Sequence, residues 1–88
     1  MRQIVLSKLV EKFLKTLPPK QQRQVTLKIL SLESDVQPQD AKKLIGYSQY
    51  RVDSGEYRII YDWSEFTIYI RIVGRRNDSD VYRKLERR

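Results

Sequence analysis

The chain has 88 residues, enough for one domain spanning residues 1–88, because each half of a two-domain chain would bury too little apolar surface to offset its conformational entropy. It contains no cysteine and no histidine, which excludes disulfides, thiolate metal sites and acid–base catalysis by imidazole. The 18 basic and 11 acidic residues give a formal net charge of +7, which attracts polyanions but by itself fits nucleic acid, an acidic protein partner or a merely soluble surface.

The N-terminal part predicts a helical hairpin. Its first apolar run, Ile4 to Leu6, is too short for a secretion signal or a membrane span, so we expect a soluble cytoplasmic protein. An amphipathic helix capped by Ser7 and stopped by prolines 18 and 19 is predicted next. Its apolar positions recur at helical spacing: Leu6, Leu9, Val10, Phe13, Leu14 and Leu17. A second helix is predicted from Pro19 to about Ser34, with Val25, Ile29 and Leu32 facing inward.

The middle of the chain predicts an antiparallel meander. Residues 34–40 are polar and aperiodic, so we interpret them as a loop, followed by a short irregular piece through Lys43 to Gly46. Three segments rich in β-branched and aromatic residues then predict three strands: 50–52, 57–61 and 67–73. The turns between them are too short for a crossover helix, and Val5 is the candidate for a fourth, short strand.

After Gly74 the chain predicts a short C-terminal helix, capped by Asp78 or Ser79. Only Val81, Leu85 and Tyr82 offer it an apolar face, so we expect it to be mobile or to need a partner. The predicted fold is therefore α+β, with an N-terminal helical hairpin packed on a small, mainly antiparallel sheet of three to four strands and a short C-terminal helix.

Basic residues gather at the end of the predicted sheet. Seven of the 18 lie between Arg71 and Arg88, where only three acidic residues accompany them. Arginines and tyrosines also alternate along the predicted strands, and this mixture favours single-stranded RNA over a duplex. Strand tyrosines usually pack in sheets, so we predict structural roles for Tyr57, Tyr61 and Tyr69. Tyr82 lies beyond the last strand, where contact with a substrate is easier to arrange.

Several motifs together resemble the RelE/ParE toxin superfamily. They are Lys43-Leu44-x-Gly46, Tyr50-Arg51-Val52, Gly55-Glu56-Tyr57-Arg58-Ile59-Ile60-Tyr61, Val73-Gly74-Arg75-Arg76 and Val81-Tyr82. With the upstream strand and helical hairpin, the resemblance covers essentially the whole chain. It implies a RelE-like mRNA interferase, the toxin of a type II toxin–antitoxin system. Such enzymes act on mRNA in the ribosome: the ribose 2′-hydroxyl attacks the adjacent phosphate, without a metal or other cofactor. It also implies a partner antitoxin and a hetero-oligomeric complex.

The resemblance also implies roles for individual residues. Arg58 corresponds to the arginine that stabilises charge on the reacting phosphate, Arg76 to the one beside the leaving oxygen, and Tyr82 to the tyrosine that orients the substrate and stacks on a base. Arginine suits the first task because its planar guanidinium binds phosphate bidentately and stays charged. Four further basic residues are expected to bind RNA: Lys43, Arg51, Arg75 and Arg83. The alternative for Arg58 is a salt bridge to Asp53 or Glu56.

One position departs from the RelE pattern. RelE-type enzymes carry two basic residues in the strand that begins near Tyr50; here Arg51 matches the first, whereas Asp53 falls on the second. A carboxylate could accept the 2′ proton, so Asp53 is a candidate general base, and the identity of that base stays open. Two other functions also remain: a ParE-like inhibitor of DNA gyrase, against which Arg76 and Tyr82 weigh, and a non-catalytic basic RNA-binding module.

Overall fold

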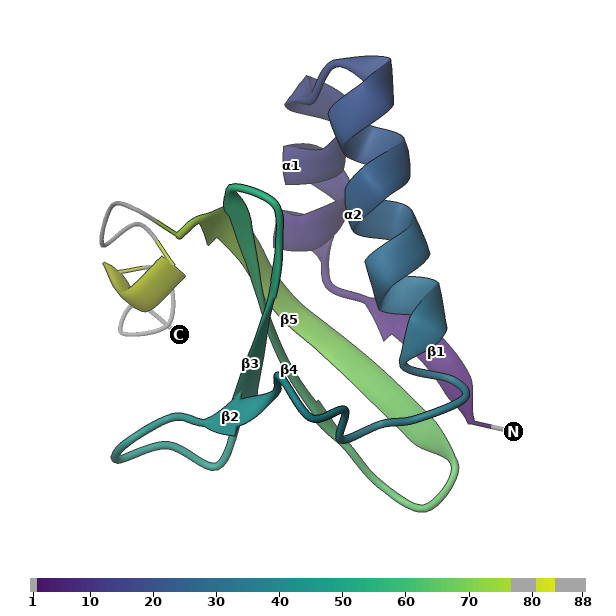
Figure 1. The fold of residues 1–88 in the computed structure, drawn as a ribbon, viewed down its shortest axis with the longest axis vertical. Helices are drawn as coiled ribbons and strands as arrows, with labels where there is room; N and C mark the ends of the chain where they lie inside the picture. The colour runs from purple at the N-terminus through teal and green to yellow at the C-terminus, as the bar shows by residue number, and fades with distance from the viewer. Residues whose placement is uncertain (1, 77–80, 84–88) are drawn as a thin grey trace.

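The computed structural model describes residues 2–76 and 81–83 of the chain. Its elements in chain order are β1 (Gln3–Leu6), α1 (Lys8–Thr16), α2 (Pro19–Ser31), β2 (Lys42–Lys43), β3 (Tyr50–Ser54), β4 (Tyr57–Trp63) and β5 (Thr67–Arg75). Residues 81–83 add one helical turn. The five strands form one sheet in the order β1-β5-β4-β3-β2, in which only the β1–β5 pair is parallel. Both long helices lie on one side of the sheet and the C-terminal turn lies on the other (Figure 1).

The helical hairpin agrees with the prediction. The Ser7 hydroxyl accepts a hydrogen bond from the Val10 amide at 3.2 Å and thereby caps α1. Pro19 is the first residue of α2, where the missing amide hydrogen costs no helical hydrogen bond. Helix α2 ends at Ser31, three residues before the predicted end, and turns follow it. No described helix is long and apolar enough to cross a membrane.

The sheet contains the predicted meander and two further strands. Strands β3, β4 and β5 pair antiparallel as expected, and β1 supplies the short strand predicted around Val5, parallel to β5. The segment expected to be irregular contains β2, whose Lys42 and Lys43 pair with Arg51 and Tyr50. Two lysines carry no β-strand signal, so this pairing could be found only from the tertiary structure. The sheet therefore has five strands rather than three or four.

A β-bulge in β5 places Ile70 and Ile72 on opposite faces of the sheet. Ile60 pairs with Ile72 whereas Tyr61 pairs with Ile70, which leaves Arg71 as the extra residue of β5. Because the bulge shifts the alternation of side chains, Ile70 contributes to the core under the helices and Ile72 to the opposite face. The predicted apolar residues of both helices, together with Tyr57 and Tyr61, lie in or against the helix-side core, with the exception of Leu9, which is 46% exposed.

The opposite, outer face of the sheet carries a second, small apolar cluster. It consists of Leu44, Ile60, Ile72 and Val81, with Tyr82 packed against it. Val81 is 0% exposed, so the turn that carries Tyr82 is anchored to the sheet more firmly than its small apolar face suggested. The predicted cap residues Asp78 and Ser79 and the predicted contact of Leu85 lie outside the described residues.

Candidate active site

The centre of the candidate site is an ion pair between neighbouring strands. Asp53 of β3 and Arg58 of β4 are register partners, and both side chains point to the outer face of the sheet. Arg58 donates from Nε to Asp53 Oδ1 at 2.8 Å and from Nη2 to Oδ2 at 3.3 Å. The salt bridge considered as the alternative role for Arg58 is therefore present, with Asp53 as the partner.

Arg76 and Tyr82 join this pair from more distant parts of the chain. Arg58 Nη1 donates to the Tyr82 hydroxyl at 2.9 Å. Arg76 Nη1 lies 3.8 Å from Asp53 Oδ2, and the Arg76 amide donates to the Glu56 carbonyl at 2.9 Å, which ties the end of β5 to the β3–β4 turn. The structure thus brings together the three residues to which the resemblance gave catalytic roles.

Arg58 keeps donors for a ligand despite these contacts. A guanidinium group has five N–H bonds. Within the described residues, three of them are used, two by Asp53 and one by Tyr82. The Arg76 side chain is 46% exposed and meets Asp53 only at salt-bridge distance, so its guanidinium is also accessible. Both arginines are therefore able to bind an additional anion without losing the ion pair.

Electrostatics keep this group charged and positive. The hydrogen bond from Arg58 lowers the pKa of Asp53, and the positive charges of Arg58, Arg51 and Arg76 lower it further, against the opposing effect of burial. The same hydrogen bond raises the pKa of Arg58. We call Arg51, Arg58 and Arg76 around Asp53 the arginine cluster. Three cations face one carboxylate there, so the cluster carries excess positive charge that suits a phosphate group.

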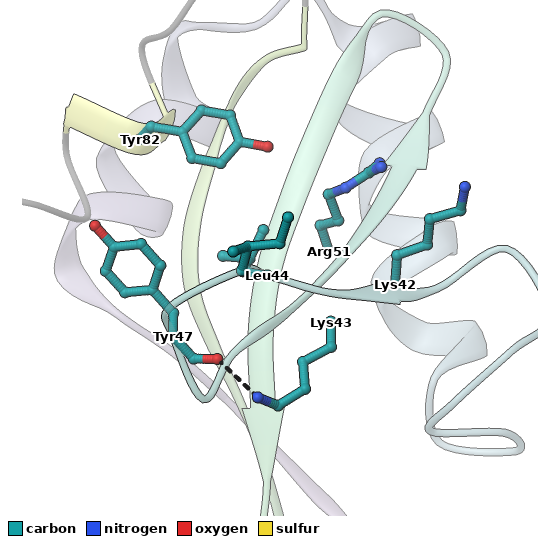
Figure 2. A pocket seen from close by; sticks show the side chains of 7 residues that line it. Lys42, Lys43, Leu44, Tyr47, Arg51 and Tyr82 are labelled. Carbon is teal, nitrogen blue, oxygen red and sulfur yellow. Dashed lines mark hydrogen bonds between the residues drawn. The ribbon is translucent and has the colours of Figure 1, made fainter.

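An open pocket of about 420 Å³ adjoins the arginine cluster. Its described lining residues are Lys42, Lys43, Leu44, Ile45, Tyr47, Arg51 and Tyr82. In the view of Figure 2, the rings of Tyr47 and Tyr82 lie on one side of Leu44, and Lys42 and Arg51 lie on the other. Tyr82 and Arg51 belong to both the pocket and the surroundings of Asp53, so the two sites are continuous.

The other predicted RNA-binding residues have different placements. Lys43 lines the pocket, but its ammonium group donates to the Tyr47 carbonyl at 3.1 Å and so stabilises the loop. Arg75 at the end of β5 and Arg83 in the C-terminal turn are exposed, and neither is placed by the structure in the arginine cluster or the pocket.

Sequence reasoning missed Lys42, Ile45 and Tyr47 as residues of this site. The available signal was Gly46, because glycine often marks a backbone conformation that other residues resist; its φ is +81°, a value that side-chain-bearing residues rarely adopt. A tight turn at Gly46 brings the residues on both sides of it to one surface. Among the described residues, no group of three or more acidic side chains is placed to hold a metal ion.

By sequence alone, the chain matches no protein-family model and no curated protein. By fold, it is similar to a chain of the antitoxin–toxin complex RelB–RelE from Methanococcus jannaschii, with 28% identity, a TM-score of 0.68 and coverage of 89% of this chain and 94% of that one. A chain of the archaeal RelE–RelB complex from Pyrococcus horikoshii OT3 matches with 26% identity, a TM-score of 0.70 and coverage of 85% and 94%. The isolated E. coli RelE toxin matches at 18% identity and a TM-score of 0.74 over 99% and 97% of the two chains. The chain therefore has the fold of the RelE toxins.

Proposed function

We propose that this chain is the toxin of a toxin–antitoxin system and that it cleaves mRNA in the ribosomal A site. The fold supports the first part, because the similar structures include an isolated RelE toxin and RelE–RelB complexes. A cognate antitoxin is then the expected protein partner, and its acidic residues would complement the +7 charge of this chain.

The observation that carries the proposed cleavage is the convergence of Arg58, Arg76 and Tyr82 beside a basic pocket. Attack of a ribose 2′-hydroxyl on the adjacent phosphate forms a new P–O bond as the 2′ oxygen loses its proton. The bond to the 5′ oxygen breaks and that oxygen takes up a proton, which leaves a cyclic phosphate and a free 5′-hydroxyl. Negative charge grows on the phosphate oxygens during this step. Contacts with the described residues leave two N–H bonds of Arg58 to stabilise that charge, and the accessible guanidinium of Arg76 lies beside it for the leaving oxygen.

Tyr82 has two functions in this proposal. Its hydroxyl accepts the hydrogen bond from Arg58 and helps to orient that guanidinium, while its ring lines the pocket where a base would lie. Stacking on the ring would hold the nucleotide so that its phosphate meets the arginines.

Asp53 fits a positioning role better than the candidate role of general base. Both of its oxygens accept hydrogen bonds from Arg58, and the surrounding arginines lower its pKa, so it is a weak proton acceptor at neutral pH. Its bidentate contact holds the Arg58 guanidinium in one orientation, which a reacting phosphate would require.

Primer extension on a translated transcript tests this proposal. We expect the purified protein to introduce cuts within codons when ribosomes translate the message and to leave the same RNA intact without ribosomes. Arg76→Ala should abolish the cuts and relieve growth arrest on expression, and its circular dichroism spectrum should match the wild type. Inhibition of gyrase supercoiling without mRNA cuts would overturn the proposal in favour of a ParE-like activity.

A further inference from the structure

We propose that Tyr47 is a specificity-determining residue, which contacts the base of one RNA nucleotide in the pocket that it lines together with Tyr82. This inference rests on the proposed function, since it concerns the substrate of the same site. It adds residues to which neither the motifs nor the resemblance gave a role: Tyr47, Ile45 and Lys42.

The loop that forms one wall of the pocket is held in a defined shape. The Leu44 amide donates to the Gln49 carbonyl at 3.0 Å, and the Tyr47 amide donates to the Leu44 carbonyl at 3.4 Å. Lys43 adds its bond to the Tyr47 carbonyl, and the buried Leu44 side chain anchors the loop in the outer apolar cluster. The pocket is therefore formed before a ligand arrives, which lowers the entropy lost on binding.

The size and lining of the pocket fit a nucleotide. Its volume of about 420 Å³ lies at the lower end of the roughly 300–1,000 Å³ found for small-ligand sites. Two tyrosine rings offer stacking surfaces for a base. Ile45, which is 98% exposed at the rim, adds an apolar surface that a base could cover.

The charges of the pocket favour an anionic ligand. None of its described lining residues is acidic, and Lys42 and Arg51 are register partners on neighbouring strands. Arg51 also acts on Asp53, so positive charge extends from the pocket to the arginine cluster. A backbone phosphate beside Lys42 and Arg51 and the next one at Arg58 would follow this path.

An acidic peptide would also be attracted to these charges, but the aromatic lining favours RNA. Tyr82 links a phosphate site to a base site within one residue, since its hydroxyl contacts Arg58 and its ring lines the pocket. Alternation of phosphate and base contacts is characteristic of proteins that bind single-stranded RNA.

The direct test is NMR titration of the full-length, ¹⁵N-labelled protein with AMP, GMP, CMP and UMP, and with inorganic phosphate as a reference. We expect the nucleotides to shift the backbone amides of residues 42–47 more strongly than phosphate does, with unequal affinities among the four bases. Tyr47→Ala should weaken nucleotide binding roughly 5- to 100-fold, whereas Tyr47→Phe should retain it because the stacking ring remains.

The matched control is Phe66→Ala, which removes an aromatic ring that is 73% exposed in the turn between β4 and β5 and does not line the pocket. It should leave nucleotide binding unchanged. Equal shifts of residues 42–47 by phosphate and by nucleotides would overturn the inference. So would shifts caused by a poly-glutamate peptide but not by nucleotides, because the pocket would then be a protein-docking site.

A second readout separates this inference from the proposed function. On translated mRNA, Tyr47→Ala should change the base preference at the cut sites relative to wild type, while Phe66→Ala should keep it. An unchanged preference together with unchanged nucleotide affinity would refute the role of Tyr47 and leave the nuclease intact. Nucleotide binding in the pocket of a wild-type protein that cuts no mRNA would refute the nuclease and retain the subsite.

Discussion

Two bidentate Arg–Asp pairs lie on the outer face of the sheet, and they share their geometry and burial but differ in their surroundings. Arg58 contacts Asp53 at 2.8 and 3.3 Å, and Arg71 contacts Asp62 at 3.1 and 2.9 Å. All four side chains are half-buried, with 16–32% of their surface exposed. A bidentate ion pair at this depth is therefore not sufficient to define a functional site.

The surroundings of the two pairs account for the difference. Around Asp62, Gln49 donates a further hydrogen bond at 3.2 Å, and the Arg71 guanidinium lies 4.5 Å from the centre of the Tyr69 ring. The Arg71 pair is thus balanced in charge, and its guanidinium already stacks on an aromatic face. Around Asp53, the additional arginines leave positive charge in excess, and the pocket gives a ligand access to it. Asp62 also lines a pocket, but its volume is about 120 Å³, against about 420 Å³ for the pocket beside the arginine cluster. Excess positive charge and the larger pocket, rather than ion pairing, distinguish the candidate site.

The largest expected effect is on the cleavage rate, and it distinguishes Arg58 from Arg71. Arg58→Ala should reduce cleavage of translated mRNA by roughly 100- to 1,000-fold, because one donor to the transition-state charge is lost. Arg71→Ala should leave the cleavage rate unchanged, although it breaks an ion pair of the same kind. Single-turnover rates on programmed ribosomes measure both. Equal losses in the two variants would mean that Arg58 acts through stability alone.

Asp53→Asn tests the positioning role against base catalysis. The asparagine keeps one acceptor oxygen for Arg58, so the rate loss should stay below the roughly 100- to 10,000-fold expected for removal of a general base. The dependence of the rate on pH should keep its wild-type shape, and Asp62→Asn is the matched control. Loss of the acidic limb of the pH profile in Asp53→Asn alone would restore Asp53 as the base.

Val81→Ala tests whether burial of Val81 fixes Tyr82 beside the Arg58–Asp53 pair. Val81 is fully buried in the outer apolar cluster, so removal of two carbons should cost roughly 1–2 kcal/mol of unfolding free energy. The neighbouring Tyr82 should lose its fixed position beside Arg58, and the cleavage rate should therefore fall several-fold. The Arg71–Asp62 ion pair should stay unchanged. Urea unfolding and cleavage assays on the same preparation measure the two effects. A destabilised variant with the full wild-type rate would show that the anchor does not position Tyr82.

The smallest expected effect is on stability in acid. Because the pKa of Asp53 lies below its ordinary value of 3.8 in the folded protein, its carboxylate stabilises the fold above that pH. This contribution is lost as the pH falls through the lowered pKa, where the folded state finally takes up the proton. The free energy of unfolding should therefore fall less steeply below about pH 4 in Asp53→Asn than in the wild type. Parallel curves for the two proteins would show that the ion pair adds no net stability.

Local patterns in the sequence determined most of the fold. The spacing of apolar residues in α1 and α2, Ser7 as a cap and the prolines between the helices each act within a few residues, so the helical hairpin follows from local physics. The β-branched and aromatic runs with short turns likewise led to the meander of β3, β4 and β5. Strand β2 was not predictable, because two lysines form it only where Arg51 and Tyr50 offer a free strand edge.

The sequence also determined which residues to consider for function, since the motifs singled out Arg58, Arg76 and Tyr82. Only the tertiary structure decided how they meet. The register of β3 against β4 places Asp53 opposite Arg58, and burial of Val81 brings Tyr82 to the same guanidinium. These contacts depend on strand pairing and packing between distant segments, which no local pattern encodes. For the same reason, the pocket with Tyr47 became visible only once the loop around Gly46 was folded against the sheet.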